Sequence, residues 1–243
     1  MSASLVIIPT YNELGNIEKM VRKVFSLPQP FHLLIIDDGS PDGTAQKVKE
    51  LQTEFTDNLF LVQRTGKLGL GTAYIAGFKW ALERNYQYIF EMDCDFSHNP
   101  DDLVRLYNAT ATAGFDIAIG SRYVTGGGFV NWPKDRIRLS KNASLYVNLV
   151  TRIGIKDPTA GFICYKRKVL ETIDLDKIQF VGYAFQIEMK FAARKLGFTI
   201  TEVPIIFTER VEGVSKMSRN IIREGILGVL KIQWNSWFSS YRK

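Results

Sequence analysis

The sequence predicts an α/β fold in which helices cover both faces of a mostly parallel β-sheet. Short apolar runs that are typical of strands alternate with segments of helical periodicity over the first 120 residues. The runs are apolar throughout instead of alternating with polar residues, which indicates strands that are buried on both faces. The chain has 243 residues, of which 46% are hydrophobic, so we expect one such domain with a large core.

Five strands and their helices can be assigned in order along the first half of the chain. We expect strands at residues 5–8, 33–36, 59–62, 88–92 and 116–120. A helix follows each of the first four strands. The first of these helices has an apolar face made by Ile17, Met20, Val21, Val24 and Phe25. In such a sheet, ligands bind beyond the carboxyl ends of the strands.

The second half of the chain shows a weaker alternation. Residues 122–138 predict a long loop with three glycines and four basic residues, and loops of this length are often functional. The other elements that we expect are a helix at 139–153, a helix around 185–197, a strand at 199–207 and a basic loop at 208–219. Residues 1–220 are therefore predicted to form one domain, and residues 221–243 a C-terminal amphipathic helix.

Charge is distributed unevenly along the chain. Residues 1–120 contain 10 Lys and Arg against 15 Asp and Glu, or −5, whereas residues 121–243 contain 21 against 10, or +11. An acidic half and a basic half indicate two kinds of partner, such as a cation and an anion, although randomly scattered surface charge would give the same totals. Nucleic acid is not an expected partner, because no groove-reading or base-stacking motif accompanies the basic residues.

The start of the chain and its cysteines bear on the compartment. The first residues lack the basic region of a signal peptide, and no run reaches the roughly 18 apolar residues of a membrane span. The two cysteines, Cys94 and Cys164, have no metal-binding spacing and suit a reducing compartment. We therefore expect a protein in a reducing compartment that has no membrane span of its own.

Three carboxylates mark the end of the fourth strand, in the stretch EMDCDFSHNP. Alternate residues of a strand point to the same face, so Glu91, Asp93 and Asp95 are expected on one side, with the two aspartates at the open end. Like charges this close repel unless a cation compensates them, and Mg²⁺ takes one or two carboxylates together with phosphate oxygens. Asp93 and Asp95 are thus predicted metal ligands, the alternative being a solvated acidic loop. We expect His98 to be a turn or capping side chain.

Polar or glycine-rich sequence follows the other strands as well. The segments are PTYNE, DDGSPDGT, KLGLGT and GSRY, and none has the G-x-G-x-x-G or P-loop pattern. Ser40 and Asp42 are expected to cap the next helix, whereas Asp38 caps nothing and suits the hydrogen-bond donors of a base or ribose. The glycines of KLGLGT fit either a phosphate cradle or a turn before a closely packed helix.

As a set, these motifs resemble those of the family-2 glycosyltransferases with a GT-A fold. The matching segments, in order, are PTYNE, DDGSPDGT, KLGLGTAY, MDCDFSHNP, GSRY and DPTAGF, and the resemblance covers about residues 4–220. Within that family the chain is most similar to the polyprenol-phosphate (dolichol-phosphate) mannose synthases. The resemblance implies a Rossmann-like sheet of GT-A type and transfer of a sugar from a nucleotide to a polyprenyl phosphate.

The resemblance also implies where the donor binds. The nucleotide would contact residues that follow the first four strands, namely Pro9, Tyr11, Glu13, Asp38, Lys67, Gly69 and Asp93. Mg²⁺ or Mn²⁺ on the donor diphosphate would be held by Asp93 and Asp95. Ser97 stands where some relatives have a glutamine.

The acceptor phosphate would be bound by basic residues of the second half. The resemblance implies Arg122, Arg136, Ser140, Arg210 and Lys216 for this role. Arginine offers a rigid fork that suits phosphate, which agrees with the positive charge of this half. We predict Asp95, Arg122 and Arg210 as the catalytic residues.

The implied reaction transfers mannose from GDP-mannose to a polyprenyl phosphate and inverts the donor linkage to give a β-linked product. No catalytic base is expected, because the attacking phosphate is already anionic. One alternative is a polyprenyl-phosphate glucosyltransferase that uses UDP-glucose. Another is transfer to a saccharide hydroxyl with Glu188 as the base, and a third is a non-catalytic module that binds nucleotide or lipid phosphate.

A lipid acceptor requires contact with a membrane surface. Residues 221–243 combine Trp, Tyr, aliphatic and basic residues as interfacial helices do, although a helix packed on the domain's own core would show the same pattern. We expect a peripheral protein on the cytoplasmic face of a membrane. Relatives of this family carry their own membrane spans or rely on small membrane partner subunits. The sequence does not decide how this chain reaches its lipid acceptor.

Overall fold

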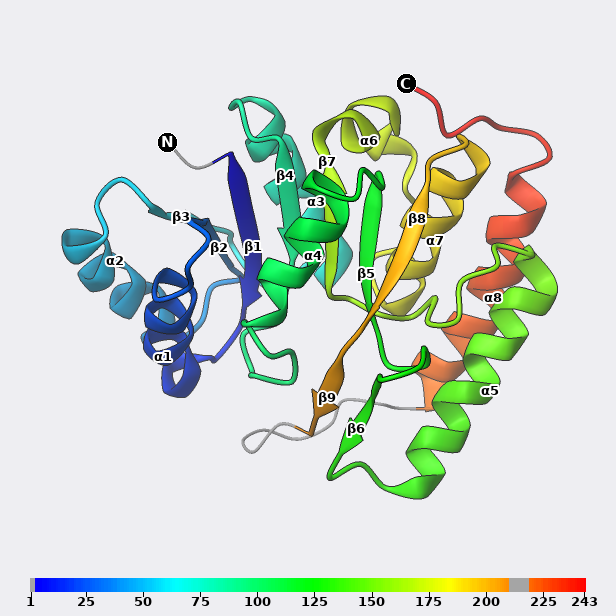
Figure 1. The fold of residues 1–243 in the computed structure, drawn as a ribbon, viewed down its shortest axis with the longest axis horizontal. Coiled ribbons are helices and arrows are strands. Elements are labelled where there is room, and N and C mark those ends of the chain that lie inside the picture. Colours follow the sequence, from blue (N-terminus) through cyan, green and yellow to red (C-terminus); the bar gives the residue numbers. More distant parts are fainter. Residues whose placement is uncertain (1–2, 210–218) are drawn as a thin grey trace.

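A seven-stranded sheet forms the centre of the computed structural model, which describes residues 3–209 and 219–243, without the side chains of Tyr183 and residues 219–224. The strand order is β3–β2–β1–β4–β7–β5–β8 (Figure 1). The strands are β1 (Ser4–Thr10), β2 (His32–Asp37), β3 (Leu59–Gln63), β4 (Tyr88–Glu91), β5 (Ile117–Ser121), β7 (Ile163–Lys166) and β8 (Ile200–Pro204). Only β7 runs antiparallel to its neighbours, β4 and β5, so the predicted mostly parallel sheet is confirmed.

Helices cover both faces of the sheet, as predicted. The helices are α1 (Leu14–Phe25), α2 (Thr44–Glu54), α3 (Leu70–Leu82), α4 (Asp102–Ala111), α5 (Lys134–Thr151), α6 (Arg167–Thr172), the 3₁₀ turn η1 (Leu175–Lys177), α7 (Tyr183–Lys195) and α8 (Arg219–Asn235). The side chains of β1 alternate between two cores. Val6 and Ile8 pack with α1, α2 and α4, whereas Leu5 and Ile7 pack on the face of α3, α5, α7 and α8.

The region after β5 is more regular than the sequence predicts. The strand β7 was not expected, because its short apolar run ends in Lys166 and does not by itself predict a strand. The expected long loop at 122–138 contains β6 (Gly128–Val130) and the first turn of α5. The expected strand at 199–207 is divided between β8 and β9 (Ile206–Thr208), and β9 pairs with β6 in a second, small sheet.

The C-terminal helix has one face on the domain and one face in solvent. Val229 and Ile232 of α8 are buried, and α8 lies beside α5 and α7. The chain then returns to the domain, where Tyr241 is buried and Arg242 forms a β-bridge with Ile173. Among the described residues, no helix combines the length and the apolar character that crossing a bilayer requires. The division at residue 220 stays a prediction.

Candidate active site

The carboxyl ends of β1, β2, β4 and β5 meet at one edge of the sheet, the lower edge in Figure 1. The parallel register sets Thr10 beside Asp37 at this edge. The small sheet of β6 and β9 lies at the same edge. The predicted site residues that follow these strands therefore gather in one region, where parallel sheets bind ligands.

The turn after β2 is held by its own polar side chains. Asp37 accepts hydrogen bonds from the Thr10 hydroxyl at 3.0 Å and from the Ser40 hydroxyl at 2.5 Å. Asp42 accepts from the backbone N–H groups of Leu14 at 3.1 Å and Thr44 at 3.0 Å, at the starts of α1 and α2. The N-cap of α2 is Gly43, so Asp42 binds these N–H groups from the position before the cap and is not the cap itself. The Ser40 hydroxyl does not cap α2 but accepts the Asn12 N–H at 3.0 Å.

The predicted nucleoside contact Asp38 forms a bidentate ion pair with Arg64. The two hydrogen bonds measure 2.7 and 2.9 Å, and both side chains are largely buried. Arg64 also donates to the Thr72 hydroxyl at 2.8 Å, which links this pair to the first turn of α3. Asp38 is therefore held rigidly at the site, and a ribose or base would share its oxygens with Arg64.

The other predicted donor residues surround this pair. The Lys67 ammonium lies 4.9 Å from the centre of the Tyr11 ring, so these two come together. Glu13 accepts a hydrogen bond from the Asn16 amide at 2.9 Å. Gly69 has a φ of +101°, a conformation that other residues rarely adopt, so the sequence needs glycine at this turn.

The two aspartates of the predicted metal site lie just beyond the end of β4. The Asp93 side chain is 40% exposed, and its carboxylate lies 3.8 Å from the His98 ring nitrogen Nδ1. Asp95 is half-buried and accepts the Ser97 backbone N–H at 3.0 Å. Within residues 3–209 and 219–243, no group of three or more His, Cys, Asp or Glu side chains is placed to hold a metal. A cation at this pair would need further ligands from water or substrate.

Glu91 lies in the interior, whereas Asp93 and Asp95 lie at the open end of the strand, where the sequence predicts these two aspartates. The strand ends at Glu91, so the spacing-of-two rule no longer applies to residues 93 and 95. Glu91 is fully buried and accepts a hydrogen bond from the Gln186 amide of α7. Burial raises the pKa of Glu91 to about 7, and the buried Lys190 opposes this rise.

His98 packs in the interior and does not cap a turn. Its ring stacks on Phe162 at 5.0 Å between centroids and meets Phe207 edge-on at 5.4 Å. Burial lowers the pKa of His98 to about 4, so the ring is neutral near pH 7.

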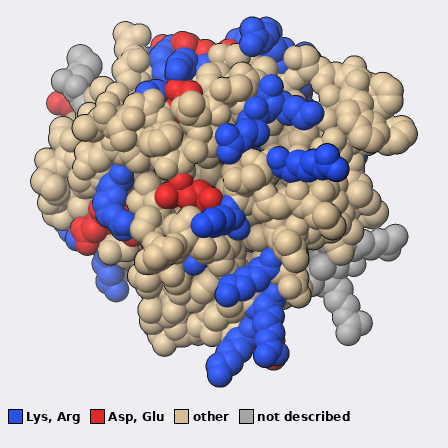
Figure 2. Space-filling view, turned by 45° about the vertical axis from the view of Figure 1, so that its right-hand side comes forward, with Lys and Arg blue, Asp and Glu red and all other residues tan. Residues whose placement is uncertain are grey.

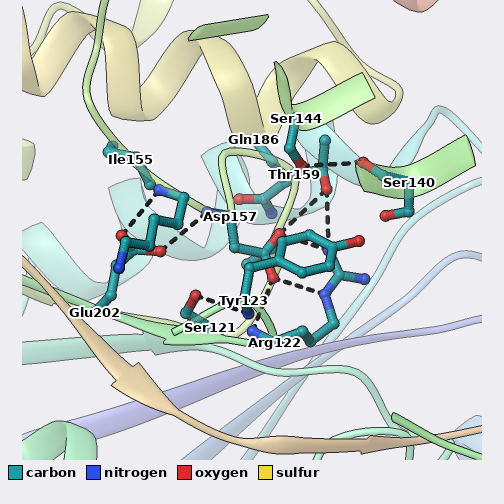
Figure 3. A network of polar contacts seen from close by, with 12 residues as sticks. Ser121, Arg122, Tyr123, Ser140, Ser144, Ile155, Asp157, Thr159, Gln186 and Glu202 are labelled. Carbon is teal, nitrogen blue, oxygen red and sulfur yellow. Dashed lines mark hydrogen bonds and ion pairs between the residues drawn. The ribbon is translucent and has the colours of Figure 1, made fainter. Parts of the chain in front are cut away.

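Arg122 is the centre of a second cluster (Figure 3). Its guanidinium donates to both oxygens of the fully buried Asp157, at 2.7 and 2.6 Å, and to the Thr159 hydroxyl at 2.9 Å. Asp157 is itself placed by Glu202, whose carboxylate accepts its backbone N–H at 2.9 Å. Four rings lie with their centroids 5.5–5.9 Å from the Arg122 guanidinium, those of Tyr123, Phe129, Trp132 and Phe207.

Two of the other predicted acceptor residues, Arg136 and Ser140, lie beside this cluster. Arg136 of α5 forms an ion pair with Glu209 and lies 4.6 Å from the Trp132 ring centre. Ser140 lies one turn further along α5, and Figure 3 shows it near Arg122 and Tyr123. Arg210 and Lys216 lie outside the described residues.

A family model described as glycosyl transferase family 2 matches residues 5–174. The chain belongs to this family. Polyprenol monophosphomannose synthase of Mycolicibacterium smegmatis is 50% identical over 226 residues, which make up 93% of this chain and 85% of that protein. Undecaprenyl-phosphate mannosyltransferase of Micrococcus luteus is 44% identical over 227 residues, or 93% of this chain and 92% of that protein. The prediction of a glycosyltransferase is therefore confirmed.

Solved structures share the fold of this family-2 glycosyltransferase. Glucosyl-3-phosphoglycerate synthase from Mycobacterium tuberculosis, in complex with Mn²⁺, UDP and glucosyl-3-phosphoglycerate, gives a TM-score of 0.67 at 17% identity and covers 95% of this chain and 79% of that one. A mannosyltransferase from Pyrobaculum calidifontis, in complex with GDP-Man and Mn²⁺, gives 0.60 at 17% identity. The match covers 97% of this chain but 64% of that one. These likenesses confirm the predicted GT-A fold.

Two residues of this glycosyltransferase site were not predicted from the sequence. Arg64 follows the third strand directly, so its place at the strand end was a usable signal. Asp157 belongs to the DPTAGF segment of the family pattern, but its pairing with Arg122 spans 35 residues of chain. No local spacing predicts such a contact.

His98 gives this glycosyltransferase a specific response to acid. Because its folded-state pKa of about 4 lies below the ordinary 6.5, its contribution to stability is present above pH 6.5 and is lost as the pH falls towards 4. A His98→Phe variant keeps a ring between Phe162 and Phe207 and should lose less stability over this range. Chemical denaturation at several pH values measures the difference, and equal pH slopes for the two proteins would contradict the prediction.

Proposed function

We propose that this chain transfers mannose from GDP-mannose to a polyprenyl phosphate and forms a β-linked polyprenyl-phosphate mannose. The names of its two sequence relatives support the lipid phosphate acceptor and the sugar. One observation carries the site: the His98 ring lies 3.8 Å from Asp93 and packs on Phe207, which in turn lies 5.5 Å from Arg122. The acidic pair and the basic cluster are thus separated by about two side chains, as adjacent sites for a donor diphosphate and an acceptor phosphate require.

The acidic pair suits a divalent cation. Asp93 and Asp95 offer two partly exposed carboxylates, and Mg²⁺ or Mn²⁺ typically completes its shell with water and phosphate oxygens. Such an ion, when bound, would offset negative charge on the leaving diphosphate. The Mn²⁺ in the complexes of both solved neighbours supports this assignment. The choice between the two metals is part of the test below.

The basic cluster suits the acceptor phosphate. Asp157 and the surrounding rings hold the Arg122 guanidinium in place, so little side-chain entropy remains to be lost when an anion binds. Arg136 and Ser140 project from the same end of α5 and would complete the contacts. For Arg210 and Lys216 the proposal rests on the family resemblance alone.

The reaction needs no protein base, since the attacking phosphate oxygen is anionic near neutral pH. The alternative, transfer to a saccharide hydroxyl, would need Glu188 as the base, and the position of Glu188 speaks against that role. Glu188 is buried, and one of its oxygens accepts the backbone N–H groups of Gln179 and Phe180 at 2.9 and 3.0 Å. Its carboxylate is buried and bound by backbone N–H groups of the protein itself.

A transfer assay tests the proposal. The purified protein is incubated with labelled GDP-mannose or UDP-glucose, a polyprenyl phosphate and Mg²⁺ or Mn²⁺, and label extracted into organic solvent is counted. Metal-dependent label from GDP-mannose, in a product that NMR shows to be β-linked, is the expected result. If only UDP-glucose gave label, the transferred sugar would be glucose and not mannose. An α-linked product would contradict direct displacement. Donor binding without transfer would favour a non-catalytic module.

We further propose that α8 and α5 meet the membrane, on its cytoplasmic face. The outer side of α8 and the tail exposes Trp234 (60%), Trp237 (63%) and Phe238 (74%), and the neighbouring α5 exposes Leu145 and Leu149. Indole and aliphatic groups of this kind partition into the interfacial region of a bilayer. Figure 2 turns this side forward and shows Lys and Arg predominating over Asp and Glu, which suits anionic lipid.

Substitution of Trp234, Trp237 and Phe238 by serine should weaken binding to anionic liposomes by about tenfold or more. Point substitutions are preferable to a deletion, because Val229 and Ile232 of the same helix belong to the core. Liposome flotation measures binding, and Phe115→Ser, an exposed site elsewhere, is the matched control. Wild-type protein that does not bind protein-free liposomes would instead favour a membrane partner subunit.

A further inference from the structure

The residues 178–182 connect η1 to α7 and contact three other parts of the fold. They touch the glycine-rich turn at the start of α3, the buried side of α7, and the inner side of α8. The proposed function assigns no role to this segment. Its contacts place it against Gly69 and Gly71, in the turn that follows Lys67.

The contact with the glycine-rich turn is made backbone to backbone. The Val181 carbonyl accepts the Gly71 N–H at 2.8 Å, in the first turn of α3. A Cβ added at Gly71 would lie 2.8 Å from the Phe180 carbonyl oxygen, and one added at Gly69 would lie 3.1 Å from Val181. The glycines of KLGLGT therefore serve close packing, and the Gly71 N–H is bound to Val181. The position of this turn follows the position of residues 178–182.

A buried carboxylate holds the segment in turn. One oxygen of Glu188 accepts the Gln179 and Phe180 N–H groups at 2.9 and 3.0 Å, and the Tyr241 hydroxyl donates to the other at 3.4 Å. Burial raises the pKa of Glu188 above its ordinary value, although these hydrogen bonds oppose the rise. Glu188 thus connects Tyr241 of the C-terminal tail to the segment that contacts the glycine-rich turn.

The helix α8 supports the same segment from outside. A Cβ added at Gly228 would lie 3.0 Å from the Phe180 ring, so the helix packs on this ring without a side chain between them. The Asn235 amide donates to the Gln179 side-chain oxygen at 3.2 Å. The helix whose outer face we assign to the membrane therefore contacts, with its inner face, the segment that fixes the donor turn.

We propose that Glu188 and Phe180 are positioning residues of the donor site, and that α8 and the C-terminal tail are part of its support. They hold Val181 against Gly71 and so fix the turn that carries Lys67. This inference rests on the proposed function for the identity of the donor. The contacts themselves do not depend on it.

Binding of GDP-mannose with Mn²⁺, measured by calorimetry without acceptor, tests the proposal in four variants. Glu188→Ala and Phe180→Ala should each weaken donor binding by about tenfold, as expected when one or two hydrogen bonds or a packed ring are lost. Glu188→Gln retains an acceptor oxygen for both N–H groups and should stay within about twofold of wild type. Phe115→Ala, at an exposed ring between α4 and β5, should bind the donor as wild type does.

Hydrogen exchange at the Gly71 amide provides a readout that does not require the donor. Exchange should be faster in Glu188→Ala and Phe180→Ala and unchanged in Glu188→Gln. Unchanged exchange, or unchanged donor affinity in the two alanine variants, would overturn the proposal. Loss of donor binding in Glu188→Gln would also overturn it, since the carboxylate itself would then be needed. Wild-type protein that binds neither GDP-mannose nor UDP-glucose would refute the proposed function, and Gly71 exchange would then decide the positioning role alone.

Discussion

Replacing Asp95 with asparagine is expected to lower kcat/KM for sugar transfer by about a thousandfold. The substitution removes one of the two charges that would hold the cation on the donor diphosphate. The amide oxygen can still accept the Ser97 N–H that Asp95 binds at 3.0 Å, so the turn after β4 should persist. The extractable lipid label gives the rate, and Mn²⁺ titration followed by electron paramagnetic resonance gives the metal affinity.

A matched variant separates the metal site from general charge effects. Asp176→Asn also removes one negative charge, but Asp176 is highly exposed and pairs with Lys79 at the surface. Exposed pairs contribute little to stability, so both activity and Mn²⁺ affinity should be unchanged. If Asp95→Asn retained the rate and Mn²⁺ affinity of the wild type, Asp95 would have no place in the metal site.

The sequence predicts the fold and the gathering of several carboxylates at one edge of the sheet, because both depend on local patterns. Continuous apolar runs separated by helical segments require a sheet that is covered twice, and parallel strands bring their carboxyl ends together. Asp38, Asp93 and Asp95 follow such strands directly, so their gathering at one edge could be predicted.

The parts that could not be predicted depend on contacts between distant residues. The burial partner of Glu91 is one example, because Gln186 lies 95 residues away on α7. The pairing of Arg122 with Asp157 and the packing of His98 on Phe162 likewise require the folded chain. Burial, and not spacing, decides the environment of these charges.

Asp157→Ala is expected to lower the free energy of unfolding by about 3–5 kcal/mol. Asp157 is fully buried and the Arg122 side chain is 9% exposed, so the substitution leaves a largely desolvated guanidinium without its counter-charge. The surface pair of Arg22 and Glu54 provides the contrast. Both of its side chains are about half exposed, so Glu54→Ala should have a much smaller effect on the free energy of unfolding. Denaturant titration monitored by circular dichroism measures both values.

The double variant Arg122→Met with Asp157→Leu then separates stability from function. Removing both charges together leaves no unpaired ion, so much of the lost stability should return, as with other buried pairs replaced by apolar residues. Transfer to polyprenyl phosphate should not return, because the guanidinium that we propose binds the acceptor is gone. A stable double variant with wild-type acceptor KM would mean that Arg122 serves the fold alone. A stable but inactive one would mean that this buried pair is retained because it orients Arg122 for the acceptor phosphate.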